Sequence, residues 1–345
     1  MLKRINSFYR NAILVIVSLL VGVGIFIWLG KMIGWQQFFD AFHGFMWWQA
    51  LVIITLTFLI AIVGNWRWQE ILKDSGSEIS FSKLFRIYLG GYAIMYLVPI
   101  ILLAGEIFRA YALTREEKVR LPRSAASVII ERILEWTINL LVIFLGLFLF
   151  AFKLNILPNN ILIVFGVALG LFIISLAYFY SKALRQKSIV QGIVRTLSKK
   201  EMGNDSGLLE TEEIVFKFFQ PKNKAFQVGL LLSILRASVM QLRTWILILF
   251  LAGIGVGFVK SLSILGFSYL SAMVPIPASL GSHELIQIVA FSSIGLAAAT
   301  ATAFTMIIRG CEVLVSLTGL AFIIKKGFNI LGEKFNSNVN NNLQL

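Results

Sequence analysis

Long apolar runs recur along the chain and are separated by short polar segments. Six of these runs have the length of a membrane span, at 11–30, 47–66, 124–152, 161–180, 225–253 and 299–324. A helix of about 20 apolar residues crosses the roughly 30 Å hydrocarbon core of a bilayer. The pattern therefore predicts an all-α polytopic membrane protein with about six transmembrane helices.

Two shorter apolar segments, Tyr88–Phe108 and Leu262–Ile276, are interrupted near the middle by glycine or proline. Basic residues flank the first segment on both sides, and Lys and Arg mark cytoplasmic loops. A segment with cytoplasmic flanks on both sides enters and leaves the membrane from one face, so we predict a re-entrant broken-helix hairpin. The same reasoning predicts a second hairpin at the other segment. The expected breaks are at Pro99, Gly105, Pro275, Pro277 and Gly281.

The basic residues also predict an orientation for the whole chain. Nine Lys and Arg residues lie between Lys182 and Lys224, and Lys325 and Lys326 follow the last span. We therefore expect an integral protein of the cytoplasmic membrane with both termini in the cytoplasm and a cytoplasmic linker at 181–224. The asparagine-rich segment 336–345 is expected to be a disordered tail.

An internal repeat emerges at an offset of 176 to 177 residues. The segment 89–100 matches 265–276, with Leu, Gly, Val, Pro and Ile recurring in register, and Arg67 falls opposite Arg243. An Arg-x-x-Glu spacing also recurs. We expect repeat one at about 47–153 and repeat two at about 225–328, within a single transmembrane domain 1–335. Because the charges place the first hairpin inside and the second outside, the repeats have inverted topology, which is a transporter architecture.

Charged residues within the predicted membrane segments are candidate site residues, because burying a charge in lipid is costly. Arginine offers a fork of donors suited to phosphate. The candidate substrate-binding residues are Arg109, Arg132, Arg243 and Arg309, and Arg236 is a further intramembrane charge. An alternative stays open, since Arg and Glu three residues apart share a helix face and could simply neutralise each other.

Six other residues are candidates for gating or coupling. They are Glu106, Glu131, Glu135, Glu284, Glu312 and His283. Glu106 and Glu284 follow the hairpin breaks, where a carboxylate could also merely stabilise a helix N-terminus. The segment 277–283 loosely resembles the Pro-Ser-Gly-His box of lipid phosphatases, but the second histidine and the arginine-rich box are missing. We therefore expect no catalytic residue, no metal site and no cofactor.

The overall composition bears on one further function, nucleic-acid binding. Apolar residues make up 58% of the chain, the formal net charge is +14 and the mean hydropathy is +0.84. Such a positive charge could indicate nucleic-acid binding, but the Lys and Arg residues collect in loops beside apolar spans, as orientation signals and contacts to anionic lipid do. No nucleic-acid partner is expected.

In its motifs around Pro99, Gly105-Glu106, Glu131-Arg132 and 275–284, the chain resembles the lysylphosphatidylglycerol synthase transmembrane, or flippase-like, family over about residues 10–330. The resemblance implies movement of an anionic or modified lipid between leaflets. It also places five residues near the pathway: Glu106, Arg109, Arg132, Glu284 and Arg309. The large soluble domain that makes the lipid in two-part members is not expected here, so lipid synthesis is not either.

The sequence thus predicts a flippase-like translocase for an anionic or modified phospholipid or a polyprenyl-phosphate-linked sugar, acting by alternating access. The alternative is a membrane-embedded transferase, or an accessory subunit of a lipid-modifying or glycosyl-transferring enzyme. The expected partner is a membrane lipid. The pattern is also compatible with a homodimer and with a separate lipid-modifying enzyme or glycosyltransferase as partner.

Overall fold

A computed structural model describes residues 36, 45–97, 103–154, 159–192, 207–253, 255–272 and 282–342. Every regular element in these ranges is a helix, which confirms the all-α prediction. The predicted first span, 11–30, lies outside the described residues.

Four long helices form the frame of the molecule. They are α3 (Trp47–Asp74), α6 (Leu121–Leu154), α10 (Lys224–Ala252) and α13 (Ala298–Asn342), and each contains an apolar stretch long enough to cross a membrane. A further helix, α7 (Asn159–Leu184), covers the span predicted at 161–180. Helix α13 continues through most of the segment for which composition predicted disorder, because a formed helix gains one hydrogen bond for each residue it adds.

Each predicted broken segment is a pair of short helices. The first pair is α4 (Phe81–Leu97) and α5 (Ala104–Glu116), and the second is α11 (Phe258–Ala272) and α12 (Ser282–Ser293). The second pair extends well beyond the predicted 262–276, since a second apolar segment follows Ser282. Of the predicted breaks, Gly105 lies in the first turn of α5, whereas Pro99, Pro275, Pro277 and Gly281 lie outside the described residues.

The predicted linker contains one well-packed helix, α9 (Gly207–Phe218), which lies against α6. Phe216, Phe218 and Phe219 are almost fully buried there, in a cluster that also includes Leu134 of α6. Burying three aromatic side chains supplies enough apolar area to fix this helix on the frame.

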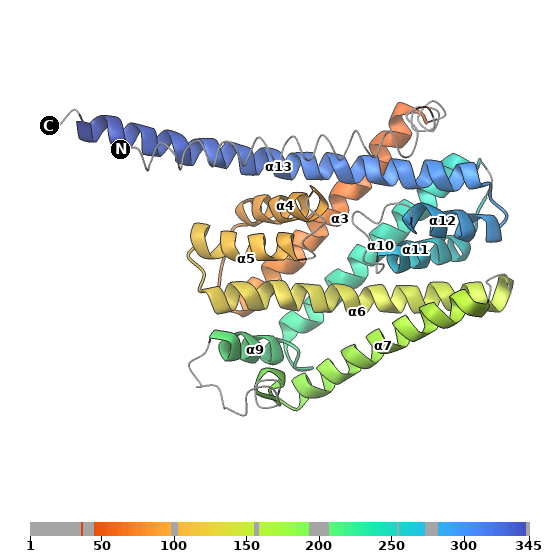
Figure 1. Cartoon of the computed structure of the whole chain (residues 1–345), viewed down its shortest axis with the longest axis horizontal. Helices are drawn as coiled ribbons and strands as arrows, with labels where there is room; N and C mark the ends of the chain where they lie inside the picture. Colours follow the sequence, from red (N-terminus) through yellow and green to blue (C-terminus); the bar gives the residue numbers. More distant parts are fainter. Residues whose placement is uncertain are drawn as a thin grey trace.

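The same order of helices occurs twice, long–short–short–long, in α3–α4–α5–α6 and in α10–α11–α12–α13. The contacts between the halves are reciprocal: α3 packs on α10, α4 packs on α13, and α11 packs on α6. Figure 1 shows α4 and α5 toward one end of α6, and α11 and α12 toward its opposite end. Exchanging the halves reproduces the same set of contacts, as a twofold relation between them would.

Glycines allow close approach at both reciprocal contacts. A Cβ atom on Gly266 of α11 would lie 3.1 Å from the Cα atom of Gly146 on α6, and a Cβ atom on Gly319 of α13 would overlap the carbonyl group of Leu89 on α4. Small residues at such positions let helix backbones pack tightly within a membrane.

Candidate substrate site: a buried arginine–glutamate network

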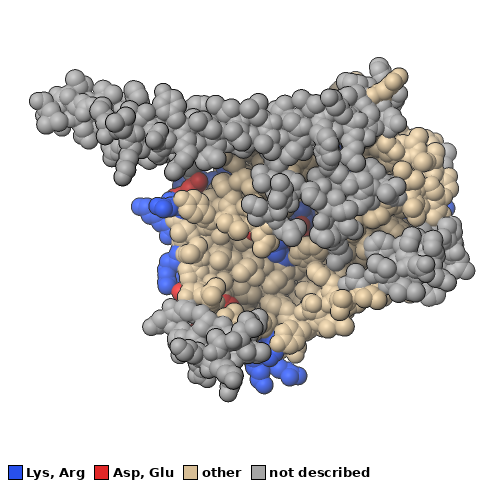
Figure 2. Space-filling view, in the orientation of Figure 1, with Lys and Arg blue, Asp and Glu red and all other residues tan. Residues whose placement is uncertain are grey.

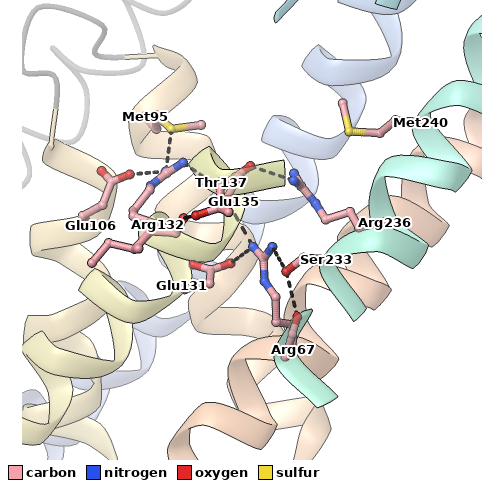
Figure 3. Close-up of polar contacts among 12 residues, drawn as sticks. Arg67, Met95, Glu106, Glu131, Arg132, Glu135, Thr137, Ser233, Arg236 and Met240 are labelled. Atoms are coloured by element: carbon pink, nitrogen blue, oxygen red, sulfur yellow. Dashed lines mark hydrogen bonds and ion pairs between the residues drawn. The ribbon is translucent and has the colours of Figure 1, made fainter. Parts of the chain in front are cut away.

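The polar face of α6 carries the centre of a charged network. Glu135 forms ion pairs with three arginines, which lie on three different helices (Figure 3). Its carboxylate oxygens lie 2.6 Å from Arg236 Nη1 of α10, 3.0 Å from Arg132 Nη1 one turn earlier, and 3.9 Å from Arg67 Nη2 of α3. Glu135 thereby joins α3, α6 and α10.

Glu131, one turn before Glu135, forms the second centre. Its Oε1 atom accepts a hydrogen bond of 2.8 Å from Arg67, and its Oε2 atom lies 2.5 Å from Nη1 of Arg109. Arg67, Arg109 and Glu131 are each at most 5% exposed. An isolated charge buried to this degree would be strongly destabilising, so these three residues require one another.

Glu106 extends the network onto α5. Its carboxylate forms a close ion pair with Arg132, whose Nη2 atom also lies 3.2 Å from the Met95 sulfur (Figure 3). Because Glu106 and Arg109 lie three residues apart, α5 offers both to the network from one face.

The network carries a net positive charge. It contains four arginines, at 67, 109, 132 and 236, and three glutamates, at 106, 131 and 135, so one guanidinium charge exceeds the carboxylates. A small cavity of about 40 Å³ lies against it, lined by Arg109, Glu131, Arg132, Glu135 and Arg236 together with Tyr88, Gly91, Tyr92, Met95 and Gly105. Charged atoms are visible in a hollow near the middle of a mostly uncharged face (Figure 2). A cavity with this charge favours an anionic group.

The crossing of α3 and α10 contains two matching hydrogen bonds. Arg67 of α3 donates from Nη1 to Ser233 Oγ of α10 at 3.0 Å, and Arg243 of α10 donates from Nη1 to Thr57 Oγ1 of α3 at 3.2 Å. Both arginines and both hydroxyls are separated by 176 residues, the offset of the sequence repeat. Each half therefore contributes the same arginine and the same acceptor position to the other.

Comparison with known proteins identifies the family of this chain. Residues 15–319 match the family model described as the lysylphosphatidylglycerol synthase TM region. The chain belongs to this family. It is also 24% identical, over 270 residues, to a UPF0104 membrane protein of Methanocaldococcus jannaschii, a match that covers 75% of this chain and 79% of that protein. No solved structure matches the chain.

The structure divides the candidate residues of this lysylphosphatidylglycerol synthase TM-region protein into two groups. Arg109, Arg132, Glu106, Glu131 and Glu135 come together in the network described above. A second group lies in the other half, where Glu312 is within electrostatic reach of Arg243 and Arg309, and His283 is within reach of Arg309. Glu284 belongs to α12, but its side chain lies outside the described residues.

The second group is less charged than the first. At an offset of 177 residues, Arg309 and Glu312 correspond to Arg132 and Glu135, but a buried isoleucine, Ile308, corresponds to Glu131. On α12, His283 and Gln287 each have a buried side-chain atom that finds no hydrogen-bond partner in the described ranges, and Gln287 donates to Ser268 Oγ at 2.6 Å. The two halves of this chain thus hold a strongly charged half-site and a more neutral one.

Sequence reasoning missed two members of the network. Arg67 was noted only as a repeat match to Arg243, and Arg236 only as an intramembrane charge, although both contact glutamates of α6. The sequence did hold a signal, because the repeat places Arg67 and Arg243 at equivalent positions. Within the described ranges, no group of three His, Cys, Asp or Glu residues could hold a metal ion.

Proposed function

We propose that this protein is a flippase-like translocase that moves an anionic or modified phospholipid, or a polyprenyl-phosphate-linked sugar, between leaflets by alternating access. The observation that carries this proposal is the membrane-buried network with one excess arginine beside a cavity. A phosphate group entering this cavity would meet guanidinium donors and would neutralise the excess charge. The family name supports a lipid as the transported molecule.

The proposed alternating access rests on the two halves being inverted repeats. The first half, α3 to α6, contains two long spans and one pair of short helices, so its chain enters and leaves on the same side if that pair is re-entrant. Helix α7 adds one further crossing before α10, so the second half starts from the opposite side. The placement of the two short-helix pairs toward opposite ends of α6 agrees with this topology (Figure 1). Exchanging the conformations of such halves switches the side from which a central site is reached.

Cysteine labelling tests this topology. Cys311 is buried and can be replaced to give a thiol-free background. Glu78→Cys, before α4, and Gly255→Cys, before α11, are both exposed. We expect a membrane-impermeant thiol reagent to label Gly255→Cys from outside intact cells and Glu78→Cys only after the membrane is opened. Labelling of both positions from the same side would exclude inverted repeats.

Transport itself is tested in liposomes that contain the purified protein. Fluorescent anionic phospholipid, zwitterionic phospholipid and polyprenyl-phosphate lipid are incorporated separately, and a membrane-impermeant quencher reports the fraction of label that reaches the outer leaflet. We expect faster exposure of one anionic class in protein-containing vesicles. Arg132→Gln should slow it, whereas Arg120→Gln, which removes an exposed arginine paired with Glu210 at the surface, should not.

Two outcomes of the liposome assay would contradict the proposal. If well-folded protein moves none of these lipids across the bilayer, the translocase proposal is wrong, and the charged cavity would fit better with an accessory or transferase role. If Arg132→Gln and Arg120→Gln slow transport equally, the network is not the transport site.

A further inference from the structure

Arg109 differs from the other three arginines of the network in how its guanidinium group is held. Its carbon Cζ lies 3.9 Å from the centre of the Trp68 ring and 4.9 Å from that of Tyr88, so aromatic faces hold the guanidinium plane. Trp68 is itself anchored by a 3.1 Å hydrogen bond from its indole N–H to Ser127 Oγ. Cation–π contacts in a desolvated site can contribute about 2 kcal/mol, enough to fix this orientation.

The contacts of Arg109 leave one complete edge of the guanidinium unused. Nη1 is paired with Glu131, but among the residues that the structure describes Nε and Nη2 have no hydrogen-bond partner, although the side chain is only about 6% exposed. Nε–H and one Nη2–H point in parallel from the same edge, which is the fork that binds two oxygens of a phosphate or carboxylate. Arg109 also lines the cavity. An orphaned pair of donors in a buried cavity indicates a missing acceptor.

Glycine creates the space in which Arg109 lies. A Cβ atom on Gly91 of α4 would overlap Cγ and Cδ of Arg109, so the arginine stem passes directly over this glycine. Alanine at position 91 would therefore displace the arginine side chain while leaving every charge of the network in place.

We infer that the Nε–Nη2 edge of Arg109 is the headgroup-binding fork of this protein, and that it takes a singly charged phosphodiester of a lipid. This inference rests on the proposed function and narrows its substrate class. One excess positive charge is matched by a phosphodiester monoanion, whereas a phosphomonoester, at about −1.5 to −2, would leave the cavity negative. The other three arginines are held by glutamates and position the site.

The test is lipid binding to purified protein in detergent, measured by competition against a fluorescent phosphatidylglycerol. We expect unlabelled phosphatidylglycerol, a phosphodiester monoanion, to compete better than phosphatidate, a phosphomonoester, or phosphatidylcholine, a zwitterion. Soluble glycerophosphoglycerol, which lacks acyl chains, should compete weakly. Equal competition by phosphatidate or phosphatidylcholine in the wild-type protein would overturn the charge argument. Equal competition by the soluble diester would overturn the assignment to a lipid.

Two variants test the fork itself. Arg109→Lys keeps the charge but loses the bidentate edge, and we expect binding about tenfold weaker or worse, whereas the surface change Arg120→Lys should have no effect. Gly91→Ala should weaken binding in the same way, whereas Gly170→Ala, where a Cβ atom meets nothing within 4 Å, should not. Elution as a single monodisperse peak establishes that each variant is folded. Folded Arg109→Lys and Gly91→Ala variants with wild-type affinity would refute the inference.

Together, the binding and liposome assays distinguish failure of the Arg109 fork from failure of the translocase proposal. Transport by wild type that persists unchanged in Arg109→Lys overturns the fork and leaves the translocase proposal intact. Selective binding through Arg109 without any transport supports the fork and refutes the translocase proposal.

Discussion

Replacing Glu135 with glutamine should destabilise the protein far more than the same replacement at the surface. Glu135 is 15% exposed and lies within 4 Å of three arginines, at 2.6, 3.0 and 3.9 Å. Glu135→Gln removes the charge that these arginines share and raises the excess charge of the network from one to two. Breaking a buried ion pair from one side costs about 3–5 kcal/mol of the free energy of unfolding. We expect the lower end of this range, because glutamine keeps one acceptor oxygen.

Glu210→Gln is the matched control. Glu210 pairs with Arg120 at 2.9 Å, but the two side chains are 33% and 65% exposed, and such pairs contribute about 0.2–1 kcal/mol. The assay is the thermal midpoint in detergent, where Glu135→Gln should lower the midpoint by several degrees and Glu210→Gln by little. A double variant, Glu135→Gln with Arg236→Gln, restores an excess of one charge and should recover part of the loss. Equal midpoints for the two single variants would refute the view that Glu135 is the centre of a buried network.

Three further predictions concern packing and are checked by the same thermal midpoint. Gly319→Ala should cost about 1–3 kcal/mol or more, because the added methyl group overlaps backbone of α4, whereas Gly170→Ala should be neutral or slightly stabilising. Ser233→Ala and Thr57→Val should each cost about 1–3 kcal/mol, because each removes one hydrogen-bond acceptor of a buried arginine. A loss in one variant only would contradict the reciprocal crossing. Phe219→Ala should cost about 3–5 kcal/mol, since its ring is 1% exposed and packs against Phe218 of α9, Phe179 and Tyr180 of α7 and Phe226 of α10. An unchanged midpoint would show that this aromatic cluster does not fix α9 on the frame.

Much of the helical frame could be predicted from the chain alone. Spans 47–66, 124–152, 225–253 and 299–324 correspond to α3, α6, α10 and α13, because a membrane span needs a long apolar run and a helix satisfies its own backbone hydrogen bonds. The two broken segments are pairs of short helices. The extent of the second pair was underestimated, since α12 is short and its apolar residues do not reach the length of a span.

The site was harder to predict than the frame. Helical periodicity reveals partners on the same helix, and the Arg132–Glu135 pair, three residues apart, is present at 3.0 Å. It does not reveal partners on other helices, such as Arg236, 101 residues from Glu135. Two interpretations were open for the Arg-x-x-Glu pair, mutual neutralisation and a binding role. They are compatible, because Glu135 pairs with Arg132 and also with Arg236 of α10, so the network keeps an excess of positive charge.

The difference between Glu131 and Ile308 has an energetic consequence for a duplicated protein. Two identical halves would give an inward-open and an outward-open form of equal free energy, since each form would be the other with the halves exchanged. A glutamate that binds two arginines in one half, opposite an isoleucine in the other, removes this degeneracy. Under the proposed alternating access, this divergence between the repeats would give the unloaded protein a preferred side, and a bound anion that neutralises the extra charge would change that preference.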